Sequence, residues 1–224
     1  MSESISTTTP PTAGGWRRIE PIPLPVTLAA AKDAFHARGF HGTSIRDIAS
    51  RADVSLPTLY YHHDNKLGIL IALLEAGMSA VLARVNAAIA EATTPTEQLA
   101  NAIEAIVLHM TGDLELAGVA TEFRHVDPDD ERRRHYVAMR SEMEELIEDV
   151  LRRGIDSGEF HIGGDVKEAL RYLLGACQAV TTWYRTSGAR SPTEVARSYT
   201  DLSLRAVGAD PTHVHTDPGV DHKP

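Results

Sequence analysis

Cysteine is almost absent from this chain, since Cys177 is the only one among 224 residues. One cysteine excludes an intrachain disulfide framework and any Cys-x-x-Cys metal or redox motif. Because Cys177 lies in an apolar stretch with helical spacing, a buried thiol is favoured over a redox sensor. His213, His215 and His222 near the carboxyl terminus could bind a metal adventitiously, but the sequence predicts neither a metal site nor a cofactor.

Membrane-spanning and catalytic signatures are also missing. No apolar run is long enough to cross a bilayer, and the Ser/Thr/Pro-rich start lacks the blocks of a signal peptide, so we expect a cytoplasmic protein without a membrane partner. There is no His-Glu-x-x-His, Gly-x-Ser-x-Gly or Gly-rich phosphate-loop motif. A helical metal hydrolase built on His62, His63 and Asp64 is the disfavoured alternative, and we predict no enzyme and no catalytic residues.

Period-two alternation of apolar residues is absent as well, which predicts an all-α fold without strands. The helix starts are clear in the sequence. A capping side chain precedes a Glu by three residues at Thr94, Asp165 and Ser191, and a fourth start follows Asp127. We expect three short helices, a long linking helix from residue 65 to 91, and roughly four to six more.

Residues 43–62 are typical of two short helices joined by a tight turn. Thr43 or Ser44 can cap the first helix, Asp53 lies in the turn, and Ser55 caps the second helix. A short second helix with a polar and aromatic outer face suits the major groove of DNA. Its outward-facing residues are Thr58, Tyr60, Tyr61 and His62.

Residues 24–74 resemble the amino-terminal domain of the TetR family of bacterial transcriptional regulators. The matches are Ala29-Ala30-Ala31, Phe35, Gly39-Phe40, Thr43-Ser44, Asp47-Ile48-Ala49, Val54-Ser55, Leu59-Tyr60-Tyr61-His62, Lys66, Ile69 and Leu70. Two positions depart from the family pattern, which commonly has Gly at Asp53 and Phe at His63. Asp tolerates a left-handed turn, whereas a half-buried imidazole either loosens the small core or stacks as a flat ring. The resemblance implies a three-helix, helix-turn-helix DNA-binding domain followed by a helical-bundle ligand-binding and dimerisation domain.

The residues of the DNA contact follow from this arrangement. Thr58 and Tyr61 are the expected base readers, through hydroxyl and apolar contacts. Lys66, at the start of the long helix, is expected to hold a phosphate, as the corresponding Lys does in similar proteins. The predicted contacts to a double-stranded operator are Thr43, Ser44, Ser55, Thr58, Tyr60, Tyr61, His62 and Lys66.

Charge separates the two parts of the chain. Residues 16–66 carry seven basic and five acidic side chains, a net charge of +2, whereas the rest of the chain carries −11. A basic head on an acidic body fits a domain that meets phosphates. Arg17 and Arg18 belong to an arm that either reaches the DNA or stays solvated. A protein-binding adaptor with a vestigial helix-turn-helix is a second alternative function.

Domain boundaries follow composition and motif positions. We predict disordered tails at residues 1–20 and 209–224, a DNA-binding domain at 21–66 with the fourth helix linking from 65, and a ligand-binding and dimerisation domain at 67–208.

The last two helices are the predicted dimerisation element. Residues 165–186 carry two apolar stripes, so this helix needs burial on two sides. Packed with residues 191–208 across a twofold axis, it predicts a homodimer with heads about one duplex turn, roughly 35 Å or more, apart. Burial of both stripes in the monomer core is the alternative. The predicted interface residues are Leu173, Cys177, Val180, Tyr184, Tyr199 and Leu202.

The resemblance also implies a small-molecule effector that binds in the body and shifts the fourth helix, so that the heads no longer match the operator. Methionines, aromatics and scattered hydrogen-bonding groups favour a mostly apolar ligand with one polar end. Residues 122–125 and 155–160 further resemble regulators that sense lipids or acyl thioesters. We predict a repressor with these pocket residues: Met78, Leu82, His109, Met110, Phe123, His125, Tyr136, Met139, Met143, Gln178, Thr181 and Trp183.

Overall fold

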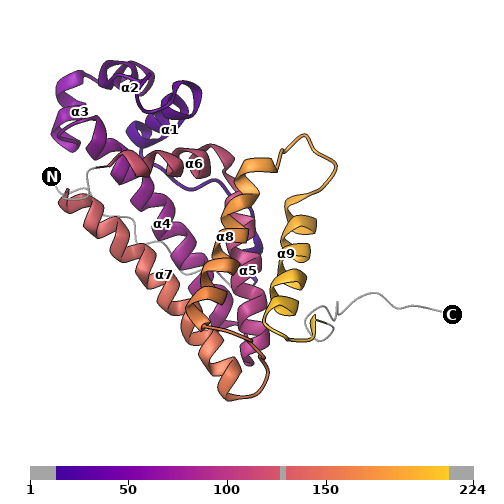
Figure 1. Ribbon diagram of the computed structural model, residues 1–224. Helices are drawn as coiled ribbons and strands as arrows, with labels where there is room; N and C mark the ends of the chain where they lie inside the picture. The colour runs from indigo at the N-terminus through magenta and orange to yellow at the C-terminus, as the bar shows by residue number, and fades with distance from the viewer. Residues whose placement is uncertain (1–13, 127–129, 212–224) are drawn as a thin grey trace.

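The computed structural model describes residues 14–126 and 130–211, apart from the side chains of residues 124 and 125. These residues form helices and no strand, which confirms the all-α prediction (Figure 1). The α-helices are α1 (Val26–Arg38), α2 (Ile45–Arg51), α3 (Leu56–His62), α4 (Lys66–Ala90), α5 (Pro95–Gly112), α6 (Leu114–Val119), α7 (Glu131–Asp156), α8 (Val166–Trp183) and α9 (Pro192–Ala206). Two 3₁₀ helices, η1 (Gly15–Arg17) and η2 (Ala120–His125), complete the described elements.

The helix starts after Thr94, Asp165 and Ser191 lie where the capping residues predicted them, whereas α7 begins at Glu131, later than a start directly after Asp127. Residues 127–129 lie outside the described residues. Ser44, Thr94 and Ser191 each form a full capping box, in which the cap hydroxyl accepts from the backbone N–H three residues on and the acid there accepts in return. Asp165 and Asp130 cap α8 and α7 through the backbone N–H two residues on. Local side-chain hydrogen bonds therefore fix where these helices begin.

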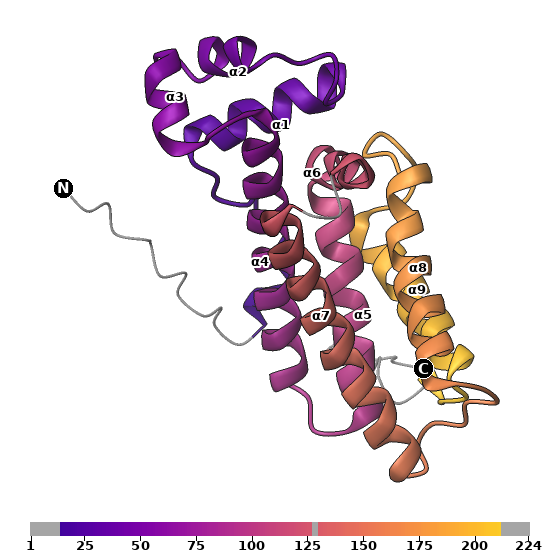
Figure 2. The same ribbon diagram turned by 60° about the vertical axis from the view of Figure 1, so that its left-hand side comes forward.

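The head contains α1, α2, α3 and the first turns of α4. Ala31, Phe35, Ile48 and Leu59 are buried there, and α4 contributes a further buried group: Ile69, Leu70, Ile71, Leu73 and Leu74. The same core continues into α6 and α7 through Leu116 and Tyr136. Helix α4 therefore belongs to both the head and the body (Figure 2).

The body is a bundle around α5, which contacts α4, α7, α8 and α9. Its buried face includes Leu99, Ile103 and Leu108, against Ile147 of α7 and Val195 of α9. Helices α4, α5 and α7 run side by side below the head, and α8 and α9 cover the other side of α5 (Figures 1 and 2). This packing leaves a partly open space between α4, α5, α6, α7 and α8, and the α8 residues that line it include the exposed Gly175, Gln178 and Ala179.

Helix α4 corrects one expectation about apolar runs. By length and composition it could cross a bilayer, and it is the only such helix among the described residues. Its apolar side chains pack inside the protein instead, from Ile69 at the head to Val85 in the body. Burial in two successive cores explains its hydropathy.

The predicted disorder of residues 1–20 is wrong for residues 14–20. Trp16 in η1 is only 2% exposed and packs in the body core, and its indole Nε1 donates to Glu91 Oε2 at 2.7 Å. The Arg17 side chain pairs with Glu104 at 3.2 Å. One buried indole and a bound guanidinium outweigh the polar composition around them, and Arg17 is therefore held away from any DNA-facing arm. Residues 1–13 lie outside the described residues.

At the other end, the packed chain extends a little past the predicted boundary. Ala209 is 8% exposed and Pro211 is also buried. The histidines at positions 213, 215 and 222 lie outside the described residues, and within the described ranges no group of three metal-ligating side chains occurs.

Candidate DNA-binding face and ligand cavity

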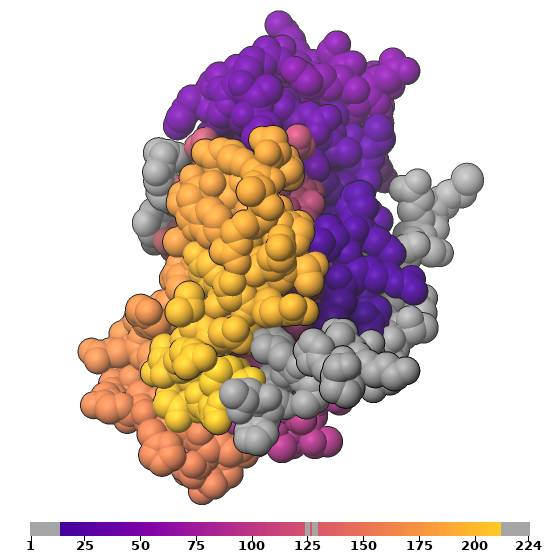
Figure 3. All heavy atoms as spheres, turned by 90° about the vertical axis from the view of Figure 1, so that its right-hand side faces the viewer, coloured from indigo at the N-terminus to yellow at the C-terminus, as the bar shows by residue number. Residues whose placement is uncertain are grey.

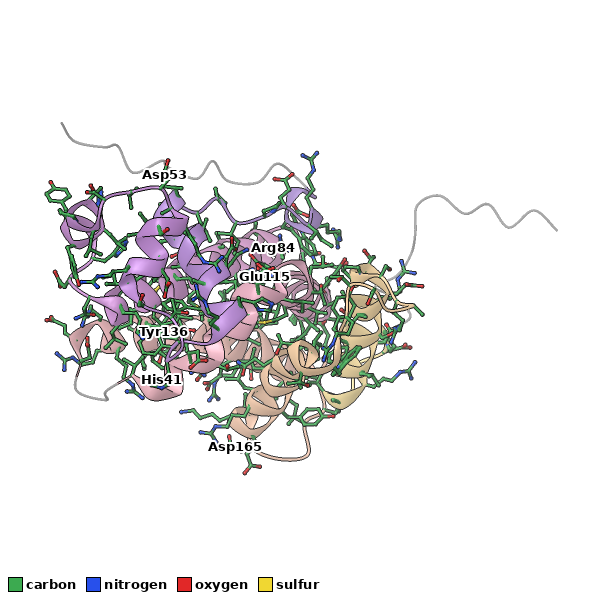
Figure 4. All side chains as sticks on the ribbon, turned by 90° about the horizontal axis from the view of Figure 1, so that it is seen from above. His41, Asp53, Arg84, Glu115, Tyr136 and Asp165 are labelled. Carbon is green, nitrogen blue, oxygen red and sulfur yellow. The ribbon has the colours of Figure 1, made fainter. Side chains whose placement is uncertain are left out.

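The turn between α2 and α3 has the left-handed residue that a tight helix-turn-helix needs. Asp53 has φ 52°, and it is the only non-glycine residue with a positive φ in the described chain. Asp adopts this region more readily than most residues, so the departure from Gly is accommodated. In the view from above, Asp53 lies at the rim of the molecule (Figure 4).

Helix α3 presents the predicted outer face. Leu59 is fully buried, whereas Tyr61 is 86% and Tyr60 47% exposed. Thr58 and His62 are exposed as well. Ser55 Oγ accepts from the Thr58 backbone N–H at 3.2 Å and lies 2.6 Å from its hydroxyl, so this pair stiffens the start of the helix. The exposed hydroxyls and rings suit contacts with base edges and phosphates.

Two predicted DNA contacts have structural roles in the head. Thr43 is 2% exposed, and its hydroxyl donates to the Ala34 and Gly39 carbonyls. Lys66 Nζ donates to the Phe40 carbonyl at 2.7 Å and the Thr43 carbonyl at 2.8 Å, above the Phe40 ring. Thr43 cannot reach DNA, and Lys66 uses two of its three N–H donors inside the protein. Ser44 is exposed but bonds Asp47.

His63 takes the half-buried position expected from the sequence. Burial, with a smaller contribution from neighbouring His62, lowers the pKa of its imidazole. Its ring lies 6.4 Å from that of His62, tilted by 52°. A neutral ring at this position is compatible with the small head core.

A cavity of about 430 Å³ lies in the body, within the range of about 300–1,000 Å³ of small-molecule sites. Six of the predicted pocket residues line it: Met78, His109, Met110, Tyr136, Gln178 and Thr181. Met143 lines an adjoining space of about 50 Å³ that shares Met78 and Gln178. Tyr136 lies inside the outline of the molecule in Figure 4.

The remaining predicted pocket residues do not line this cavity. Leu82 and Met139 pack in the body core, and Phe123 lies against Tyr136 with ring centroids 4.6 Å apart. Trp183 is exposed and stacks on Tyr199, with 6.2 Å between ring centroids. The side chain of His125 lies outside the described residues. Apolar and aromatic character is common to the core and to the cavity lining, so the sequence could not separate Leu82, Met139 and Phe123 from the residues that line the cavity.

Arg140 lines both spaces, although it was not predicted from the sequence. In the described part of the chain it has no ion pair or hydrogen bond, and its charge lies near the buried Tyr136, whose pKa burial raises. The sequence does contain a signal that Arg140 lines the cavity, because positions 136, 140 and 143 recur at helical spacing and therefore share one face of α7. The cavity therefore has apolar walls and one cation, the arrangement expected of a site for an amphipathic anion.

His109 is a further titratable group of the cavity wall, besides Arg140 and Tyr136. Burial, with a smaller contribution from the Arg84 charge, lowers its pKa to about 4. A neutral imidazole at physiological pH offers one donor and one acceptor to a ligand.

Four predicted interface residues are inside the monomer. Leu173, Cys177, Val180 and Tyr184 are at most 3% exposed and pack in the body core, and burial raises the pKa of the Cys177 thiol to about 12. Their stripe of α8 packs in this core with α5. The second stripe faces outward, with Tyr172 67% and Trp183 44% exposed, and Leu202 of α9 is 63% exposed. We call the surface formed by the exposed Tyr172, Trp183 and Leu202 with the half-buried Tyr199 the α8–α9 face.

Ion pairs join the cavity wall to the head. Lys32 of α1 binds Asp113 at 3.0 Å, with both side chains less than a fifth exposed. The same carboxylate caps α6 by accepting from the Leu116 backbone N–H, and Leu116 lines the cavity. On the other side, Arg132 of α7 lies 4.0 Å from Asp64, between α3 and α4. The head thus contacts the elements that enclose the cavity.

Family models of known proteins match both the head and the body of this chain. The family model described as bacterial regulatory proteins, tetR family, matches residues 28–73, and that described as tetracyclin repressor-like, C-terminal domain, matches residues 92–207. The fatty acid metabolism regulator protein of Bacillus subtilis is 30% identical over 164 residues, covering 70% of this chain and 80% of that protein. The HTH-type transcriptional repressor KstR2 of Rhodococcus jostii is 28% identical over 193 residues, covering 84% and 89%.

Solved structures resemble most of this arrangement of helices. FadR from Bacillus subtilis in complex with stearoyl-CoA superposes with a TM-score of 0.69 at 27% identity, covering 81% of this chain and 98% of that one. PfmR from Thermus thermophilus gives 0.72 at 29% identity, with the same coverages. The chain therefore belongs to the TetR family of bacterial DNA-binding transcriptional regulators.

Proposed function

We propose that this regulator is a cytoplasmic repressor that binds a palindromic operator as a homodimer and is released by an amphipathic acyl thioester. The observation that carries the proposal is the double role of α4. Its first turns form part of the head core, and its next turns line the cavity through Leu74, Met78 and Val81. A ligand that favours one position of α4 necessarily favours one position of the head.

The DNA contact in this proposal comes from α3. Thr58 and Tyr61 read bases, while Ser55, Tyr60 and His62 contact the backbone. Ser44 and the third N–H of Lys66 can each meet a phosphate near the start of a helix. One short helix reads few base pairs, so a palindrome and two heads supply the specificity.

The α8–α9 face supports the homodimer. A large exposed apolar patch on a regulator is expected to be covered by a partner, and a twofold axis lets one patch pair with its own copy. Tyr172 and Leu202, more than half exposed, are the proposed centre of this interface.

DNA binding is tested by a gel-shift titration on the DNA that flanks the regulator's own gene, over a range of salt concentrations. We expect dimer steps and a steep loss of affinity with salt, because phosphate contacts release counterions. Tyr61→Ala should weaken specific binding by about 1–3 kcal/mol while leaving random-sequence binding nearly unchanged. Binding that is absent on both DNAs at low salt would contradict the proposal and favour a protein-binding adaptor.

The ligand class rests on the cavity and on the comparisons. FadR, to which this chain is similar, was solved with stearoyl-CoA. Here the apolar walls suit an acyl chain, and Arg140 suits an anionic or carbonyl oxygen at its polar end. This pairing would give the Arg140 guanidinium an acceptor, which no residue in the described part of the chain supplies.

Calorimetric titration with stearoyl-CoA tests this assignment. We expect binding that weakens by about tenfold or more in Arg140→Gln, because a charge-assisted hydrogen bond is lost. Glu142→Gln, an exposed change on the same helix, is the matched control and should leave affinity unchanged. Equal affinity in all three proteins would contradict the role of Arg140, and no binding to the wild type would contradict the ligand class.

A further inference from the structure

A second cavity lies under the N-terminal segment, defined as residues 14–23. It has a volume of about 220 Å³ and is bounded by this segment, α4 and α5. His109 is the residue it shares with the main cavity. In the space-filling view the indigo N-terminal segment forms part of the body surface beneath the head (Figure 3).

The N-terminal segment is fixed to the body at three points. Trp16 is buried and donates to Glu91, and Arg17 pairs with Glu104. Arg84 of α4 donates through Nη2 to the Arg18 carbonyl at 2.8 Å. These bonds give the second cavity a defined outer wall.

Arg84 has an unused donor at this cavity. Its Nη1 is buried and has no hydrogen-bond partner among the described residues. A buried, unpaired guanidinium N–H carries an uncompensated desolvation cost, which an acceptor oxygen from a ligand would remove. In Figure 4, Arg84 lies inside the outline of the molecule, whereas Asp165 lies at its rim.

The surrounding charges limit the ligand to a single negative charge. Arg18, Glu20 and Asp113 also line the cavity. Asp113 is already paired with Lys32. Burial lowers the pKa of the Arg84 guanidinium, and the nearby Glu20 carboxylate partly opposes this. Arg18 is exposed, so Arg84 is the cation with a buried, unpaired N–H at this cavity, and one such cation beside one acid suits a monoanion better than a doubly charged phosphate.

The walls and the size define the rest of the ligand. Trp16, Ile19, Ile22 and Leu108 supply apolar surface. The volume is below the usual range of about 300–1,000 Å³ for drug-sized ligands. A small molecule with one carboxylate and one apolar group fits both constraints.

We propose that this cavity is a second effector site, which binds a small apolar monocarboxylate through Arg84 under the N-terminal segment. The site is separate from the acyl-thioester cavity and does not depend on the function proposed for it. A ligand here joins α4 to the segment that leads into α1, so it stabilises the connection between body and head.

The test uses Trp16 as a reporter, because this residue lines the cavity. The chain has two tryptophans, and Trp183→Phe leaves Trp16 as the only one. In this background, titration with benzoate should change the fluorescence of Trp16 saturably. Benzamide, its neutral analogue, and inorganic phosphate should give no saturable change. Arg84→Met should weaken benzoate binding by about tenfold or more.

Two further variants make the test decisive. Arg140→Met alters the main cavity and should leave benzoate affinity unchanged. Arg84→Lys keeps the charge but has one nitrogen in place of the Nη2 that holds the Arg18 carbonyl and the Nη1 that is free for the ligand, so it should bind benzoate more weakly with an unchanged circular dichroism spectrum even if Arg84→Met fails to fold. Equal binding of benzamide, unchanged affinity in both Arg84 variants, or loss of binding in Arg140→Met would each overturn the proposal.

Discussion

At the residue scale, Lys66 illustrates how one cation can stabilise the fold of the head and also contact DNA. Its ammonium bridges the Phe40 and Thr43 carbonyls within the loop between α1 and α2. This bridge ties the first turn of α4 to the loop that positions the helix-turn-helix. Lys66 is therefore expected to affect DNA binding through the geometry of the head as well as through phosphate.

We predict that Lys66→Ala lowers the free energy of unfolding by about 1–3 kcal/mol, because two carbonyls lose a charged donor. Urea denaturation followed by circular dichroism measures this change. DNA affinity should fall on specific and random sequences alike. Unchanged stability with a flatter salt dependence would instead assign Lys66 to phosphate alone.

His109 predicts a pH effect on stability. Its pKa is about 4 in the folded protein, below the ordinary value of 6.5. Between these values the unfolded chain binds the proton and the folded chain does not, so stability falls as pH drops through this window, by up to about 1.4 kcal/mol per pH unit. His63, whose pKa is also lowered, adds to the same trend.

The measurement is the thermal midpoint of unfolding at about pH 7.5 and about pH 5. At the higher pH neither state binds the proton, whereas at the lower pH the unfolded chain binds it and the folded chain does not. His109→Gln cannot titrate, so its midpoint should fall less than that of the wild type. His36→Gln, at an exposed position, is the control and should behave as the wild type does. An equal drop in His109→Gln would contradict the burial of a neutral imidazole.

At the scale of helices, the sequence predicted the presence and the starts of the helices well, but it predicted less well which face of a helix is buried. The capping boxes at Ser44, Thr94 and Ser191 are local, so their hydrogen bonds could be predicted from spacing alone. The two stripes of α8 are both apolar, and only packing decides that Leu173 and Cys177 face α5 while Tyr172 faces out. Trp16 was missed for the same reason, because its partner Glu91 lies far along the chain.

The α1–α6 contact is the element on which coupling is expected to depend. Lys32→Met removes the partner of a carboxylate that is 12% exposed, so the free energy of unfolding should fall by about 1–3 kcal/mol. Urea denaturation measures this loss. The change should also weaken the effect of a bound ligand on DNA affinity, since α6 lines the cavity. If the bound ligand changes DNA affinity as much in Lys32→Met as in the wild type, the coupling between cavity and head runs through α4 and not through the α1–α6 contact.

At the scale of the whole molecule, the exposed α8–α9 face predicts the oligomeric state. A variant with Tyr172→Glu and Leu202→Glu should sediment as a monomer, because two charges would be buried against their own copies. Analytical ultracentrifugation gives the mass, and DNA affinity should fall with it. Glu142→Lys on α7 is the control. A variant that remains dimeric would place the interface elsewhere.

The central claim is that this regulator binds DNA through its head and releases the DNA when its body binds a ligand. Fluorescence anisotropy of the labelled upstream DNA, bound by the regulator and titrated with stearoyl-CoA, measures both events in one experiment. We predict a saturable fall to the value of free DNA in the wild type, at higher ligand concentration in Arg140→Gln. An unchanged anisotropy, with calorimetry still showing bound stearoyl-CoA, would contradict the coupling through α4.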